Sequence, residues 1–159
     1  MTVSSMRLAA LVLGISVFAG CVSPPSGGEK LISEANQVVT AARFGRMDLV
    51  LACVKPELRT GFAASHAEWG SKIRILDMEY GGATPLDDKK AVVAVNVAWS
   101  RLDETIVRST ALRQTWEFGE DRWQIIGEEV ADGDPKLLSN GIAPPSHDSE
   151  IASSASLPP

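Results

Sequence analysis

The stretch from Ala91 to Val130 constrains the fold of this chain more than any other. It predicts three consecutive strands, because apolar and polar side chains alternate with a period of two and turn-forming residues interrupt the pattern twice. Three of the four tryptophans of the chain lie in it, at Trp99, Trp116 and Trp123. Consecutive strands joined by short turns pair antiparallel, so this stretch predicts the sheet of the domain.

The second turn of the stretch predicts which side chains share a face of the sheet. Gly119–Arg122 is a loop of even length if Phe118 pairs with Trp123. Trp116 then pairs with Ile125, and these four apolar side chains point the same way. An odd loop would expose half of them to water, so the even loop is favoured.

The first turn extends that face to the preceding strand. An even loop at Arg101–Glu104 pairs Trp99 with Ile106 and, further along, Val97 with Arg108. The resulting aromatic face comprises Val93, Val95, Val97, Trp99, Arg108, Thr110, Leu112, Gln114, Trp116, Phe118, Trp123 and Ile125. The outer face carries Arg113, Thr115, Glu117, Gln124 and Glu128.

Polar groups on the aromatic face leave two interpretations open. Arg108 and Gln114 either lie at a solvated rim or point into a pocket around which the sheet curves. In the second interpretation an arginine beside aromatic rings favours an anionic ligand such as a carboxylate. The candidate pocket-lining residues are Trp99, Arg108, Gln114, Trp116 and Trp123.

Helices are predicted upstream of the sheet. Apolar side chains recur every three or four positions from Glu29 to Phe44, and Gly45 can cap the helix. A second helix is predicted with Asp48 as its N-cap, and a third over residues 57–69. A first strand is predicted at residues 73–80. The chain therefore predicts an α+β fold, in which N-terminal helices cover an antiparallel sheet of four or more strands.

The N-terminal segment resembles the signal peptide of a bacterial lipoprotein. Arg7 precedes an apolar run over residues 8–19, which is too short to span a bilayer. Phe18-Ala19-Gly20-Cys21 is similar to a lipobox, with Phe18 where leucine is usual. The resemblance implies lipidation of Cys21 and stable anchorage by more than one acyl chain. A cleaved signal peptide with a coincidental cysteine is the alternative.

This resemblance, together with the composition of the chain, predicts how the chain is divided into segments and implies a location in the cell envelope. We expect a lipoprotein signal peptide at 1–20, a lipidated cysteine and tether at 21–28, the α+β domain at 29–130 and a disordered tail, rich in Pro, Ser, Gly and Asp, at 131–159. Val22 stands where an aspartate would favour the inner membrane, so a domain facing the periplasm from the outer membrane is favoured if the organism is Gram-negative.

Charge and the remaining reactive side chains exclude several classes of function. Without residues 1–20 the net charge changes from −5 to −6, because only Arg7 is lost, which argues against nucleic acid as a partner. Cys53 lies in an apolar run and is expected to be a buried structural thiol. His66 is predicted on the surface of the third helix. No residue pattern indicates a metal site or a cofactor.

The order of the elements resembles the nuclear-transport-factor-2-like superfamily, which includes SnoaL-like cyclases and ketosteroid isomerases. The resemblance covers residues 29–130 and depends on Gln114-Thr115-Trp116 before a tight turn, Trp123-Gln124-Ile125 after it, and a Gly-x-x-Asp step from Gly45. It implies that the sheet is curved and the domain cone-like. It implies no single function and identifies no catalytic residue, because this fold carries many activities.

The sequence supports three hypotheses about function. The first is a non-enzymatic envelope lipoprotein that binds a small ligand or an envelope protein partner. The second is an isomerase- or cyclase-type enzyme with a buried ionisable pair inside the cone, where Arg108 with Asp77 or Glu79 is the candidate pair. The third is a homodimer through the outer face at Arg113, Thr115 and Gln124. An interior filled by Trp and Val side chains would argue against the enzyme.

Overall fold

The structure, a computed structural model, describes residues 27–139. The predicted signal peptide, the lipidation site Cys21, most of the tether and the tail from residue 140 lie outside the described residues. The described part of the chain therefore consists of the end of the tether, the α+β domain and the nine residues after its predicted end at Val130.

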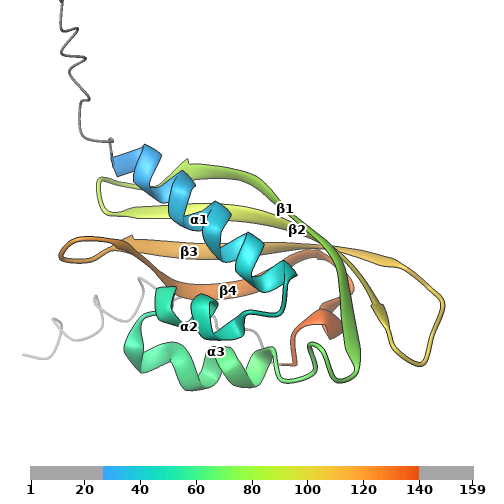
Figure 1. Ribbon diagram of the computed structural model, residues 1–159. Coiled ribbons are helices and arrows are strands. Elements are labelled where there is room, and N and C mark those ends of the chain that lie inside the picture. The colour runs from blue at the N-terminus through green and yellow to red at the C-terminus, as the bar shows by residue number, and fades with distance from the viewer. Residues whose placement is uncertain (1–26, 140–159) are drawn as a thin grey trace, which may run out of the picture.

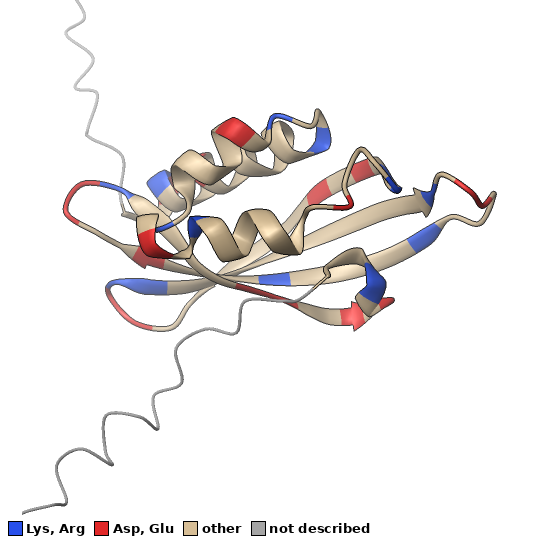
Figure 2. Ribbon diagram, turned by 90° about the horizontal axis from the view of Figure 1, so that it is seen from below, with Lys and Arg blue, Asp and Glu red and all other residues tan. Residues whose placement is uncertain are grey.

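Three helices lie on one side of a four-stranded antiparallel sheet (Figures 1 and 2). The elements are α1 (Gly27–Arg43), α2 (Met47–Cys53), α3 (Arg59–Ser65), β1 (Ile73–Pro85), β2 (Lys90–Arg101), β3 (Arg108–Phe118) and β4 (Trp123–Gly133), with short 3-10 helices η1 (Pro56–Leu58) and η2 (Pro135–Leu137). The strands pair in sequence order, so the sheet is open and β1 and β4 are its edges. The predicted α+β class is confirmed, and the cone-like shape stays a prediction.

Helix α1 forms where its apolar stripe predicts it. Its buried residues are Leu31, Ala35, Val38, Val39 and Ala42. Gly45 ends the helix with a φ of 70°. Its N–H donates to Ala42 O at 3.0 Å, and Arg46 N–H donates to Ala41 O at 2.8 Å, which is the Schellman pattern. The predicted cap is confirmed. The predicted N-cap at Asp48 is wrong, because α2 already begins at Met47.

The hairpin between β2 and β3 keeps the predicted faces but not the predicted pairs. Trp99 pairs with Arg108, not Ile106. The loop is longer because Asp103 and Glu104 bind the flanking arginines, Arg101 and Arg108, and so stay outside the ladder. A slip of two residues leaves every side chain on its predicted face, since side chains alternate with a period of two.

The hairpin between β3 and β4 begins as predicted and then departs. Phe118 pairs with Trp123 and Trp116 with Ile125. A β-bulge comes next, because Thr115 pairs with Gly127 and leaves Ile126 as an extra residue. Beyond it Gln114 pairs with Glu128. The prediction that Glu128 lies on the outer face is therefore wrong: the bulge turns it toward the helices.

The core lies between the sheet and the helices and is filled by the aromatic face. Trp99, Trp116, Val93, Val95 and Val97 are fully buried. The predicted domain boundary at residue 130 falls inside β4, and the chain after it also packs, since Leu137 and Leu138 are buried. A homodimer through the outer face stays a prediction.

Candidate functional site

A cleft of about 710 Å³ opens between the C-terminal end of α1, helix α3 and the start of β1. Its walls are mostly apolar, with Ala42, Met47, Ala63, Trp69, Ile73 and Ile75 among the lining residues. Phe44 and Leu102 also line it and are 72% and 48% exposed. Its volume lies in the range of small-molecule sites, which are usually lined by apolar side chains with a few polar groups.

His66 is a polar residue in the wall of this cleft. It caps the C-terminus of α3 and is 5% exposed. Its ring stacks on Phe62 at 4.3 Å between centroids and meets Trp69 edge-on at 4.6 Å. The predicted helix-surface position of His66 is wrong. Helix α3 ends at Ser65, the residue before His66, and the imidazole packs between the two aromatic rings.

His66 forms a buried pair with Glu128 of β4. His66 Nε2 lies 2.9 Å from Glu128 Oε2, and each side chain is 3% exposed. His66 Nδ1 lies 2.7 Å from Phe62 O. A carbonyl oxygen only accepts, so Nδ1 carries a proton. Both ring nitrogens are therefore engaged within the protein.

Two further residues connect this pair to the centre of the sheet. Gln114 Nε2 donates to Glu128 Oε1 at 2.7 Å, and Trp116 Nε1 donates to Gln114 Oε1 at 3.1 Å. Among the described residues Glu128 Oε2 has no partner besides the imidazole. The chain of contacts from Trp116 to His66 thus joins β3 and β4 to the end of α3.

The electrostatics of the pair favour a protonated imidazole. Burial lowers the pKa of His66, because a charged ring is poorly solvated there. The charge of Glu128, its hydrogen bond and the hydrogen bond to Phe62 together outweigh burial, so the pKa of His66 is raised above its ordinary value of 6.5. The pair therefore holds a proton to higher pH than a free histidine would.

The five predicted pocket residues all lie on the helix-covered side of the sheet, but none is among the described residues that line the cleft. Trp99 Nε1 donates to Thr110 Oγ1 at 3.0 Å in the core, and Trp123 Nε1 donates to Gly27 O at 3.0 Å. Gln114 and Trp116 belong to the network of His66. The structure thus brings two of the five together around a pair that the sequence did not predict.

Arg108 is engaged by groups other than the predicted carboxylates. It pairs with Glu104, its Nε lies 3.1 Å from Asp134 Oδ2, and its guanidinium lies over the Trp99 ring at 5.3 Å from the centroid. Asp77 instead lies 3.0 Å from Arg43 Nη1. The buried ionisable pair beside the cleft is His66, which lines it, with Glu128 behind it.

Three further kinds of feature can be checked in the part of the chain that the structure describes: metal ligands, membrane-spanning helices and a reactive thiol. No group of three or more His, Cys, Asp or Glu side chains between residues 27 and 139 is placed to hold a metal ion. Within the same range, no helix has the length and apolar character needed to cross a membrane. Burial raises the pKa of the Cys53 thiol, which disfavours the reactive thiolate.

Comparisons with known proteins find limited similarity. No family model matches this chain. It is 30% identical over 112 residues to a lipase-specific foldase from Burkholderia plantarii, a match that covers 70% of this chain and 28% of that protein. The chain therefore spans less than a third of the length of this relative. A SEC-C motif containing protein from Rhodopseudomonas palustris shares the fold, with a TM-score of 0.52 and 17% identity over 63% of this chain and 77% of that one.

These matches overturn the predicted membership in a nuclear-transport-factor-2-like, SnoaL-like lipoprotein family. The structural neighbour is a SEC-C motif protein and the sequence relative is a foldase, so that prediction was wrong. It depended on aromatic residues flanking a hairpin. In the structure Trp116 and Trp123 are buried side chains of the core, a role that any helix-covered sheet requires.

Proposed function

We propose that this chain is a membrane-anchored module of the cell envelope whose α+β domain binds a small amphipathic ligand in the cleft. Lipid on Cys21 would hold the domain on the periplasmic side, with the outer membrane favoured in a Gram-negative organism. The single observation that carries the binding function is the cleft of about 710 Å³ between α1, α3 and β1.

The lining of the cleft supports an amphipathic ligand. Ile73 is a fully buried part of the wall, and the partly exposed Trp69 and Ile75 offer apolar contacts that an apolar chain inside the cleft would bury further. Arg43 also lines the cleft, half-exposed, with its guanidinium 5.8 Å from the Phe44 ring centroid. Its ion pair with Asp77 leaves guanidinium donors for an anionic group, because arginine has five N–H donors.

The state of His66 favours binding over the alternative of an acid–base enzyme. A general base must reach the proton of the substrate with a free acceptor. Nδ1 of His66 is held by Phe62 O and Nε2 by Glu128, so neither nitrogen is free to accept. Trp99 and Trp116 are fully buried in the core, and an interior filled by such side chains argues against an acid–base enzyme.

A protein partner is a second candidate, favoured by the match to the lipase-specific foldase. The name of that relative describes assistance in the folding of a lipase. If the module acts similarly, the cleft would receive an apolar segment of a client polypeptide. Ile106 and Val107, which are 60% and 63% exposed in the loop between β2 and β3, would extend the contact beyond Leu102.

Filling the cleft tests the ligand-binding function. In the Cys21→Ser chain, which carries no lipid, we expect the uncharged dye N-phenyl-1-naphthylamine to bind with an increase in fluorescence. Ala63→Phe places a ring in the cleft and should weaken binding by about tenfold or more. Ala64→Phe is the matched control, because the neighbouring Ala64 is exposed and does not line the cleft.

Equal affinity in the parent and both phenylalanine variants would locate the dye elsewhere and reject the cleft as the site. An apolar peptide that displaces the dye, where fatty acids do not, would favour the protein partner.

The lipid anchor has its own test: globomycin should cause the unprocessed precursor to accumulate. If Cys21→Ala is processed and localised like the wild type, the lipid anchor is rejected.

A further inference from the structure

The His66–Glu128 pair needs one proton between its two facing atoms. With that proton present, either an imidazolium faces a carboxylate or a neutral imidazole accepts from a carboxylic acid, and no atom is left unpaired. Without it, two acceptors, Nε2 and Oε2, face each other at 2.9 Å. Both side chains are 3% exposed, so water cannot separate or solvate them.

Glu128 is the only charged group that acts on the imidazole among the described residues. The neighbours from α3 are neutral: Phe62 supplies its ring and its carbonyl oxygen, and Ser65 Oγ lies 3.0 Å from Nδ1. Trp69 adds an aromatic edge. On β4 the second oxygen of Glu128 binds only the neutral amide of Gln114. No second charge therefore stands beside the ring to compensate for the loss of the proton.

One member of the pair, His66, also lines the cleft. His66 and Trp69 both line the cleft, on the turn after α3. Trp69 is fixed at its far side, where Nε1 donates to Leu137 O at 2.9 Å. The side chain of His66 contacts β4 through Glu128. Repulsion between His66 Nε2 and Glu128 Oε2 would thus displace the wall of the cleft where it meets the sheet.

We propose that the proton shared by His66 and Glu128 keeps the cleft in its binding form, so that ligand affinity falls as the pH rises through the titration of the pair. The inference rests on the proposed function of the cleft. The direction follows from linkage: the form in which Nε2 and Oε2 lie 2.9 Å apart needs the proton, so low pH stabilises that form and the stabilisation is lost as the pH increases. The change therefore begins above the ordinary histidine range of about pH 6.5.

Dye binding at several pH values tests the inference. N-phenyl-1-naphthylamine stays uncharged, so its own ionisation cannot produce the effect. For the Cys21→Ser chain we expect affinity to fall by about tenfold between about pH 6 and pH 9. Glu128→Gln should bind equally at both, because its amide can donate to a neutral imidazole while its carbonyl still accepts from Gln114.

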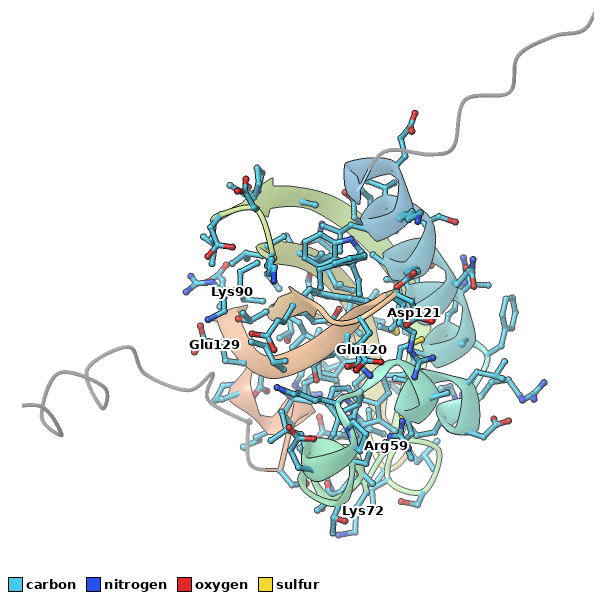
Figure 3. The ribbon with its side chains drawn as sticks, turned by 90° about the vertical axis from the view of Figure 1, so that its left-hand side faces the viewer. Arg59, Lys72, Lys90, Glu120, Asp121 and Glu129 are labelled. Atoms are coloured by element: carbon cyan, nitrogen blue, oxygen red, sulfur yellow. The ribbon has the colours of Figure 1, made fainter. Side chains whose placement is uncertain are left out.

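Glu129→Gln is the matched control for this variant. It removes the same charge from the next residue of β4, where Glu129 is half-exposed and lies at the periphery of the sheet (Figure 3). It should keep the pH dependence of the parent. Imidazole NMR in a His147→Gln chain, which retains His66 as its one histidine, should show a titration above that of free histidine.

The outcomes separate the two proposals. Affinity that is the same at every pH in the parent chain overturns the inference while the cleft remains a binding site. Loss of the pH dependence in Glu129→Gln, or a His66 resonance that titrates at or below the ordinary histidine range, overturns it as well. Absence of dye binding at every pH overturns the proposed function itself.

Discussion

Two neighbouring residues of β4, Glu128 and Glu129, form ion pairs in opposite surroundings. Glu128 Oε2 lies 2.9 Å from His66 Nε2, and both side chains are 3% exposed. Glu129 Oε1 lies 3.0 Å from Arg113 Nη1, with side chains 39% and 53% exposed. The distances are nearly equal, but the pairs differ in burial and in the partner, an imidazole inside and a guanidinium outside. The separation between charged atoms therefore says little about what an ion pair contributes to stability.

The physical cause is solvation. The outer pair is screened by water and salt, and either partner is well solvated alone. The inner pair is cut off from water, so each group depends on the other and on Gln114. Removing one partner of the exposed pair should therefore lower the free energy of unfolding only slightly, and removing one partner of the buried pair should lower it strongly.

The largest effect is expected for Glu128→Ala. It leaves His66 Nε2 and the Gln114 amide without partners in the core, so the free energy of unfolding should fall by about 3–5 kcal/mol. Urea denaturation followed by tryptophan fluorescence measures it. A loss below about 1 kcal/mol would mean that the buried pair contributes no more to stability than an exposed pair does.

Gln114→Ala should have the second largest effect. It leaves Glu128 Oε1 and Trp116 Nε1 without partners, at a cost of about 2–3 kcal/mol in the free energy of unfolding. Gln124→Ala is a suitable control, because Gln124 is on the outer side of β4 and no side-chain hydrogen bond is found for it among the described residues. Similar losses in both variants would show that the inner network adds nothing specific.

A smaller effect is expected from pH on the parent chain. Because the pKa of His66 is raised, its contribution to stability is complete below about pH 6.5 and is lost as the pH rises through its folded pKa. Urea midpoints measured across that range should fall in the parent. In Glu128→Gln they should not, and a parallel decline there would assign the pH dependence to another group.

The smallest effect is expected for Glu129→Ala. Its partner Arg113 stays solvated at 53% exposure, so the free energy of unfolding should change by less than about 1 kcal/mol. The difference should diminish further at high salt, because exposed charges are screened. A loss as large as that of Glu128→Ala would show that exposure does not distinguish the pairs.

Local patterns predicted much of the frame of the fold. The apolar spacing in α1 predicts its buried stripe, and Gly45 predicts its end, because each depends on residues within a few positions along the chain. The parity of the two turns predicts the faces of Trp99, Trp116 and Trp123, since a slip of two residues leaves a face unchanged.

The candidate site could not be predicted in the same way. His66 and Glu128 are far apart in the sequence, and each was predicted at the surface from its local pattern. The one local signal is Gly127 beside two isoleucines, where a glycine within a strand can indicate a bulge. Recognition of a bulge also requires the register of the partner strand.

The order of helices and strands, the cap of α1 and the identity of most core side chains follow from local sequence patterns, because periodicity and turn chemistry act between near neighbours. Three features depend on the packing of distant segments: Ile126 is an extra residue opposite β3, α3 ends one residue before His66, and His66 contacts Glu128. The reason is that a carboxylate and an imidazole are stable in the core only together, and that pairing exists once β4 and α3 have packed.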